Sequence, residues 1–197
     1  TGALMVQTIR DFCSRVPWVN RVASLNILES HDTARILTLV GGDPGKLEAA
    51  LALLMTMPGV PMVEYGGEVG MEGLNGEDGR RPMPWPGQAG SKSGAQTKWN
   101  GKIHRLYQDL RRSLPALQEG GLRWLAAEDD AVVFLRESAG QTALVHVARA
   151  AHDPIELDVR NLQGLSEATT VFGLPPEAQS ETLLLEADGP GARVLVW

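Results

Sequence analysis

The chain has 197 residues, of which 43% are hydrophobic, and its formal net charge is −6 at pH 7. This hydrophobic content is sufficient for a folded core, whereas the acidic balance argues against binding to nucleic acid or to an anionic membrane surface. A single cysteine excludes an internal disulfide and a cysteine-based zinc site. No apolar run reaches the roughly twenty residues that a membrane-spanning helix needs.

Helical and extended patterns alternate over the first part of the chain. Apolar residues recur at helical spacing over residues 4–16, which predicts an amphipathic helix. The continuous apolar run over residues 22–28 is typical of a strand in a parallel sheet. Asp43 followed by Pro44 predicts the start of a second helix, and residues 60–65 form the next apolar run. Because a helix joins the two runs, we expect them to be adjacent parallel strands.

A long segment rich in glycine, proline, serine and charge follows, over residues 66–98. Segments of this length are uncommon in compact domains unless they are functional or disordered. Its glycines do not have the spacing of a dinucleotide-binding or phosphate-binding loop, so we predict no nucleotide site and no cofactor. No spacing of histidine and acidic residues indicates a metal site. Helical spacing returns over residues 99–114, which predicts another helix.

The pattern changes at Pro115, which we take as a domain boundary. Turn residues then separate short runs of β character at regular intervals, which is typical of an antiparallel sandwich. The runs cover residues 122–125, 131–136, 142–148, 155–159, 168–172, 182–185 and 193–197. The sequence therefore predicts an α/β part over residues 1–114 and an all-β part over residues 115–197.

A polar cluster directly follows the first apolar run and reads Glu-Ser-His-Asp-Thr-Ala-Arg over residues 29–35. Ligands of α/β proteins bind beyond the carboxyl ends of the strands, so His31 and Asp32 are well placed for catalysis. The competing interpretation is a helix cap, in which Ser30 or Asp32 accepts hydrogen bonds from the first N–H groups of the next helix. On the local pattern alone, the cap is the better interpretation.

Two further motifs follow this cluster in order. Residues 65–68 read Tyr-Gly-Gly-Glu, and residues 80–85 read Arg-Arg-Pro-Met-Pro-Trp. With residues 26–35, they resemble the strand-seven signature and the segments after strand eight of the α-amylase family of glycoside hydrolases. The similarity is greatest to the branch of cyclomaltodextrinases, neopullulanases and maltogenic amylases. The resemblance implies that residues 1–114 are the last β/α units of an incomplete (β/α)₈ TIM barrel, and that residues 115–197 are a C-terminal antiparallel β-sandwich.

The resemblance also implies a function and roles for particular residues. It implies a retaining hydrolase that cleaves α-1,4-glucosidic linkages in an α-glucan or oligosaccharide such as cyclodextrin, pullulan or maltodextrin. Asp32 would be the catalytic carboxylate that stabilises the transition state, with His31 as a substrate contact beside it. Arg80 and Trp85 would also contact sugar, through hydroxyl groups and the apolar face of a ring. For Trp85 a structural anchor is an equally good interpretation, and for Arg80 a surface charge.

The resemblance also reveals what the chain lacks. The family's nucleophile motif, G-x-R-x-D, is absent, and the general acid of the family also precedes strand seven. We therefore expect this chain to be inactive alone and to work with the missing N-terminal part of the same enzyme. Open strand edges would allow a homodimer. We expect a cytoplasmic protein, although secretion stays open because Thr1 is not taken as the natural start.

Two departures from the family keep other functions open. Gly67 stands where the family usually has an aspartate, and Glu64 interrupts a strand that the family keeps apolar. An ionised glutamate in a barrel interior would need a partner or a raised pKa. The alternatives are a relative that transfers or isomerises glucosyl groups and a non-catalytic glucan-binding paralogue.

Overall fold

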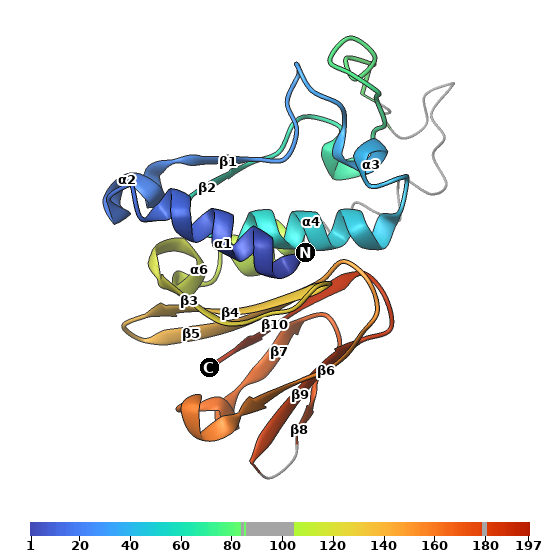
Figure 1. Cartoon of the computed structure of the whole chain (residues 1–197). Coiled ribbons are helices and arrows are strands. Elements are labelled where there is room, and N and C mark those ends of the chain that lie inside the picture. Colours follow the sequence, from blue (N-terminus) through green and yellow to red (C-terminus); the bar gives the residue numbers. More distant parts are fainter. Residues whose placement is uncertain (84, 86–104, 179–180) are drawn as a thin grey trace.

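A layer of helices separates a short parallel sheet from two antiparallel sheets in the computed structural model (Figure 1). The structure describes residues 1–83, 85, 105–178 and 181–197. The predicted α/β part and all-β part occupy the two ends of this stack. In the described part of the chain, no helix is long and apolar enough to cross a membrane.

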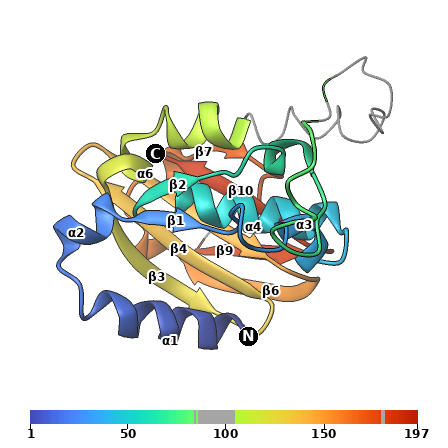
Figure 2. The ribbon, with the colours of Figure 1, turned by 90° about the horizontal axis from the view of Figure 1, so that it is seen from above.

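The two predicted strands pair in parallel, which confirms the expected βαβ arrangement. Strand β1 (Leu25–Ile27) lies beside β2 (Val60–Met62), with Leu25 opposite Val60 and Ile27 opposite Met62. Seen from above, the two strands run side by side over the helical layer (Figure 2). Both strands are shorter than predicted: residues 22–23 belong to a helix, and the N–H of Gly67 donates to the carbonyl of Glu64 in a turn that follows β2.

Four helices accompany this sheet. They are α1 (Gly2–Cys13), α2 (Trp18–Ala23), α3 (Ile36–Leu39) and α4 (Pro44–Thr56). The predicted start of α4 is confirmed, since the Asp43 carboxylate accepts hydrogen bonds from the N–H groups of Gly45 and Lys46 at 2.8 and 3.1 Å. The Pro44 ring occupies the first turn, where a missing N–H costs nothing. The local sequence therefore sets where this helix begins.

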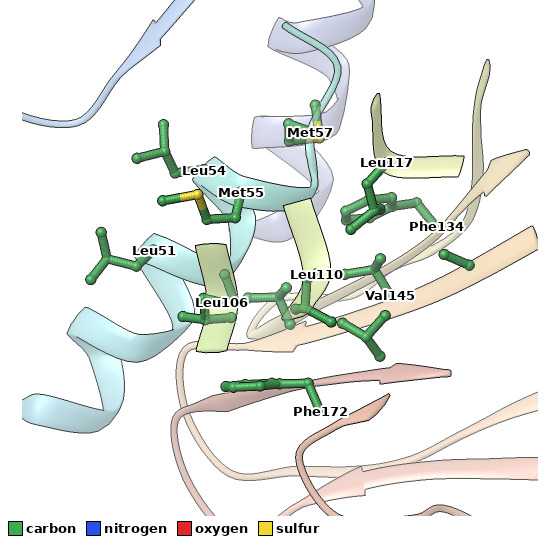
Figure 3. Close-up of a cluster of buried hydrophobic side chains, with 14 of the residues drawn as sticks. Leu51, Leu54, Met55, Met57, Leu106, Leu110, Leu117, Phe134, Val145 and Phe172 are labelled. Atoms are coloured by element: carbon green, nitrogen blue, oxygen red, sulfur yellow. The ribbon is translucent and has the colours of Figure 1, made fainter. Parts of the chain in front are cut away.

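Helix α4 is buried along most of its length. Its apolar side chains share one core cluster with side chains from the antiparallel sheet, among them Leu51, Met55, Phe134, Val145 and Phe172 (Figure 3). The helix thus joins the α/β part to the all-β part through a continuous apolar contact. Burying side chains of this size stabilises the fold by about 1.5–3 kcal/mol each.

Two arginines hold the buried C-terminal end of α4. The Arg136 guanidinium, which is fully buried, donates to the carbonyls of Thr56, Gly120 and Gly121. Arg111 donates to the carbonyls of Met57, Gly59 and Leu117. Cations at a helix C-terminus are favourable because the last carbonyls carry a partial negative charge. Burial, together with the nearby charges of Arg111 and Arg21, lowers the pKa of Arg136 to about 9.

The predicted helix over residues 99–114 is described only in part, because residues 99–104 lie outside the described residues. Its remainder is a π-helical segment, η2 (Leu106–Arg111), whose Leu106 and Leu110 are fully buried. A further short helix, α6 (Pro115–Glu119), begins where the sequence indicated a boundary. Proline at its first position explains this start.

Two sheets make up the all-β part, and every pairing between their strands is antiparallel. One sheet has the order β3-β4-β5-β10-β7 and the other has the order β6-β9-β8. The strands are β3 (Gly121–Ala127), β4 (Ala131–Ser138), β5 (Gln141–Ala148), β6 (His152–Asp158), β7 (Thr169–Phe172), β8 (Glu177–Ala178), β9 (Thr182–Ala187) and β10 (Gly191–Val196). Two 3₁₀ turns, η3 (Val159–Asn161) and η4 (Leu165–Glu167), follow β6. The seven predicted runs fall on seven of these strands, and β8 was missed because it is only two residues long.

The larger sheet is buried on both faces. One face packs on α4, η2 and α6, and the opposite face packs on the smaller sheet. Consequently every residue from Ala131 to Arg136 in β4 is buried, with no alternation between buried and exposed positions.

A pair of histidines lies at the junction of the two sheets. His146 on β5 is 2% exposed, and its Nε2 lies 2.9 Å from Nε2 of His152. Nδ1 of His152 lies 2.7 Å from the carbonyl of Asp153, which can only accept, so this nitrogen carries a proton. Burial, together with the nearby Arg193 and His152, lowers the pKa of His146 to about 3. His146 is therefore neutral at pH 7.

We expect the stability of the chain to fall as the pH drops below about 6.5. In this range His146 binds a proton in the unfolded chain but stays unprotonated in the folded chain. Because the pKa of His146 in the folded chain is about 3, this group alone lowers the free energy of unfolding by on the order of 2 kcal/mol between pH 7.5 and pH 5. Urea unfolding at the two pH values measures the loss. His146→Gln should reduce it, whereas an unchanged pH dependence in this variant would contradict the assignment to His146.

Candidate functional site

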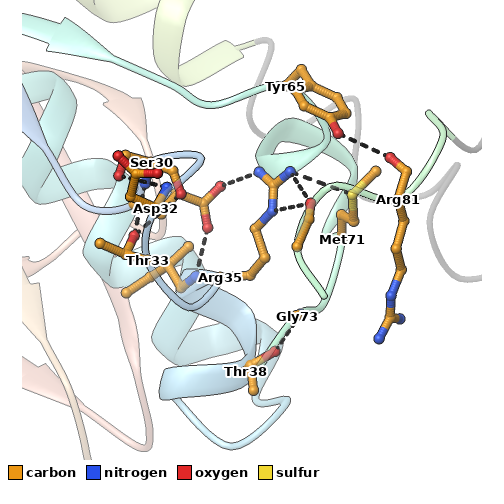
Figure 4. A network of polar contacts seen from close by, with 12 residues as sticks. Ser30, Asp32, Thr33, Arg35, Thr38, Tyr65, Met71, Gly73 and Arg81 are labelled. Atoms are coloured by element: carbon orange, nitrogen blue, oxygen red, sulfur yellow. Dashed lines mark hydrogen bonds and ion pairs between the residues drawn. The ribbon is translucent and has the colours of Figure 1, made fainter. Parts of the chain in front are cut away.

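Two polar loops meet at the carboxyl-end edge of the parallel pair. The loop after β1 carries residues 29–35, and the loop after β2 passes through a 3₁₀ turn, η1 (Gly67–Val69), and continues to Arg81. Figure 4 shows side chains of both loops directed toward one another. Because β1 and β2 are parallel, their carboxyl ends lie at the same edge, where α/β proteins place their ligand sites.

The structure brings together three of the four predicted site residues. The Asp32 carboxylate contacts His31 through one oxygen, at 3.1 Å from Nε2, and Arg80 through the other, at 3.2 Å from Nη2. Arg80 also donates from Nε to the backbone carbonyl of His31 at 3.3 Å. The side chains of His31 and Asp32 are 65% and 69% exposed. Asp32 is thus a solvent-facing acceptor held between two donors.

The fourth predicted residue, Trp85, is exposed near the end of the described loop. Its backbone N–H donates to the carbonyl of Met83 at 2.9 Å. Among the described residues, no hydrogen bond or ion pair links its indole to Asp32 or Arg80. The structure therefore leaves the substrate role of Trp85 as a prediction.

The interpretation that Ser30 or Asp32 caps the next helix is wrong. Helix α3 begins after Arg35 and has no side-chain cap from Ser30 or Asp32. The Ser30 hydroxyl instead accepts from the N–H of Asp32 at 3.3 Å, inside the loop. The N–H of Ile36 at the start of α3 donates to Glu29 Oε2 at 2.5 Å. Asp32 is thereby left available for a ligand.

Arg35 is the buried centre of the site. Its side chain is 1% exposed and donates twice to the carbonyl of Gly79, from Nε at 3.1 Å and from Nη2 at 2.7 Å. Its guanidinium carbon lies 5.0 Å from the centre of the Tyr65 ring, where a cation–π contact is favourable. The backbone N–H of Arg35 donates to the carbonyl of Gly73 at 2.9 Å. One residue of the first loop thus holds the second loop at several points.

Glu29 supplies the charge that compensates Arg35. Its carboxylate is 4% exposed, and Oε1 lies 3.3 Å from Arg35 Nη1. Burial raises the pKa of Glu29 above its ordinary value, and the charge of Glu64 adds to this, while the Ile36 N–H and Arg35 oppose it. Sequence reasoning missed the pairing of Glu29 with Arg35. The available signal was a glutamate six residues before an arginine across a polar loop, which by itself does not reveal burial.

The site has the chemistry of hydroxyl recognition. Within residues 1–83, 85, 105–178 and 181–197, no group of three or more histidine, cysteine or acidic side chains could hold a metal ion. The exposed groups are a carboxylate, an imidazole and a guanidinium, which together accept and donate hydrogen bonds. Such a set at the edge of parallel strands is typical of an enzyme site of the α/β class.

Comparison with known proteins identifies the family. The family model described as the catalytic domain of alpha-amylase matches residues 4–114, and the chain belongs to the α-amylase family. It is 32% identical to a cyclomaltodextrinase of Geobacillus thermopakistaniensis (strain MAS1) over 146 residues, which are 70% of this chain and 23% of that protein. It is also 32% identical to neopullulanase 2 of Thermoactinomyces vulgaris over 162 residues, covering 81% of this chain and 24% of that protein.

A solved structure is similar to this chain over both its α/β part and its all-β part. The debranching enzyme from Nostoc punctiforme superimposes with a TM-score of 0.82 at 25% sequence identity, covering 98% of this chain and 39% of that one. The chain spans about a quarter of the length of the curated relatives it matches.

We expect Arg35→Ala to lower the free energy of unfolding by about 3–5 kcal/mol, because it leaves the buried carboxylate of Glu29 without its partner. Urea denaturation measures the change. The matched control is Arg81→Ala, which removes an exposed ion pair with Asp78 on the same loop and should leave the unfolding midpoint almost unchanged. Equal effects of the two substitutions would contradict the role given to Arg35.

Proposed function

We propose that this chain is the C-terminal part of a retaining α-glucan hydrolase that cleaves α-1,4-glucosidic linkages in cyclodextrin, pullulan or maltodextrin. The observation that carries the proposal is the exposed Asp32 carboxylate between His31 and Arg80, at the carboxyl-end edge of two parallel strands. The family supplies the reaction class, and the curated relatives are named for hydrolysis of such glucans.

In this proposal, residues 1–114 are the last two β/α units of a TIM barrel and residues 115–197 are its C-terminal β-sandwich domain. The bare face of the parallel pair supports this view. Leu25 and Ile27 are 60% and 52% exposed, and Val60, the pairing partner of Leu25, is also exposed. Parallel sheets are normally covered on both faces, so further strands and the side chains of a barrel interior would cover this one.

We expect the isolated chain to self-associate, because β1 and β2 present unpaired edges together with this apolar face. Size-exclusion chromatography with light scattering over a range of concentrations measures the association. Ile27→Lys should weaken it, since the substitution places a charge on the exposed face. A chain that stays monomeric at all concentrations would count against missing strands at this face.

Asp32 would act on the sugar whose glycosidic bond is cleaved. Its two oxygens would accept hydrogen bonds from neighbouring hydroxyls, and these bonds would strengthen as the ring flattens toward an oxocarbenium ion. His31 Nε2 and the Arg80 guanidinium lie within 3.1 and 3.2 Å of this carboxylate, so both would reach the same sugar. Trp85 would add an apolar ring contact if the loop brings it to the substrate.

The remaining chemistry would come from the missing N-terminal part of the same protein. A retaining glycosidase needs a carboxylate nucleophile and a carboxylic acid on either side of the scissile bond. Asp32 can neither form a glycosyl intermediate nor protonate a leaving group by itself. The catalytic carboxylates act as a unit, so this chain alone would have no activity.

The test is to mix this chain with a separately expressed N-terminal part and to assay the mixture on cyclodextrin and pullulan. We expect turnover only in the mixture. Asp32→Asn should reduce it by about 10²–10³-fold, since a group that stabilises transition-state charge contributes at this level. The control is Glu77→Gln, which changes an exposed carboxylate 3.5 Å from the same Arg80 and should retain activity.

Turnover by this chain alone would refute the proposal that it lacks the nucleophile and the acid. Activity of the mixture that survives Asp32→Asn would refute the role of Asp32. Thin-layer analysis of the products separates hydrolysis from glucosyl transfer, the nearest alternative reaction.

A further inference from the structure

The loop that carries Asp32 is closed at its base by a single carboxylate. Oε2 of Glu29 accepts from the N–H of Ile36 at 2.5 Å, and Oε1 pairs with Arg35 at 3.3 Å. Residues 30–34 lie between these attachment points. Because Arg35 also donates to the carbonyl of Gly79, the same carboxylate is linked to the second loop, next to Arg80. Both loops that deliver groups to Asp32 are therefore anchored at Glu29.

Gly67 lies directly against this carboxylate. A Cβ atom added at Gly67 would be 2.3 Å from Oε1 of Glu29, whereas its next contacts, Glu29 Cδ and Val63 Cγ1, would be at ordinary distances of 3.4 and 3.5 Å. Gly67 is not among the glycines with a positive φ angle, so the backbone conformation does not require glycine here. Of these three contacts only the one with Oε1 of Glu29 is too close, and the hydrogen bonds to Arg35 and to the N–H of Ile36 hold that carboxylate in place.

We propose that Glu29 and Gly67 are a matched pair. The site has room for one carboxylate, which comes from position 29 and not from position 67. In this role Glu29 is a positioning residue for Asp32. The steric pairing stands without any assumption about catalysis. The purpose of the positioning rests on the proposed function of Asp32. The pair also explains why this chain has no side chain at position 67, since two carboxylates there would compete for one guanidinium in a buried site.

A double-mutant cycle in the whole chain tests the pairing. We expect Gly67→Ala to lower the melting temperature by about 5 °C or more, because overpacking a buried site without room is destabilising. In the Glu29→Gly background the same substitution should cause no further loss. The matched control is Gly70→Ala, since Gly70 has a φ of 72° and the strain of this substitution should be the same in both backgrounds. An equal cost of Gly67→Ala in both backgrounds would overturn the matched pair.

A spectroscopic readout tests the positioning role separately. Glu29→Gly should shift the backbone and side-chain NMR signals of His31 and Asp32, and the exchange variant Glu29→Gly/Gly67→Asp should return them toward their original positions. If the chemical shifts of His31 and Asp32 do not change when Glu29 is replaced, the positioning role is wrong. If the Glu29→Gly chain does not fold, a folded exchange variant supports the proposal, and an unfolded one contradicts it. Neither readout uses sugar turnover, so failure of the proposed hydrolase activity would leave these outcomes unaffected.

Discussion

Helix α4 is buried between two sheets, and this constraint shapes the whole structure. A helix in this position has apolar side chains on most sides, but the carbonyl groups at its end lose contact with water and need donors. Arg111 and Arg136 supply those donors and also donate to carbonyls of α6 and β3. The α/β part and the all-β part are thus joined by apolar packing along α4 and by guanidinium–carbonyl contacts at its end.

The candidate site meets a related problem in a different way. Arg35 is as deeply buried as Arg136, but it directly precedes the short helix α3. Two of its contacts are with the carbonyl of Gly79, and its charge is balanced by Glu29. A buried ion pair contributes little net stability, because desolvation offsets the attraction between the charges. Its effect here is geometric: it sets the relative position of two loops whose exposed members, Asp32 and Arg80, then meet.

The contrast between buried and exposed carboxylates separates two kinds of role. Glu29 has its hydrogen-bonding capacity used by Arg35 and the N–H of Ile36, and it has no room for a ligand. Asp32 is exposed, and its partners His31 and Arg80 are also exposed, so its carboxylate remains accessible from the solvent. In the proposed matched pair, position 67 has no side chain and the carboxylate beside Arg35 comes from Glu29 on the other loop.

The sequence by itself determined the features that depend on local chemistry. Asp43 and Pro44 start α4 wherever the helix packs, and the turn residues after Pro115 separate the antiparallel strands. The motif order also predicted the family, and it identified His31, Asp32 and Arg80 as candidates that prove to be in contact. Only the tertiary structure decided which charges are buried. Glu29 and Arg35 are separated from Gly67 and Gly79 by more than thirty residues. Glu29 meets Gly67 and Arg35 meets Gly79 because β1 and β2 lie side by side. Desolvation of a charge depends on what packs around it in space, and no local pattern contains that information.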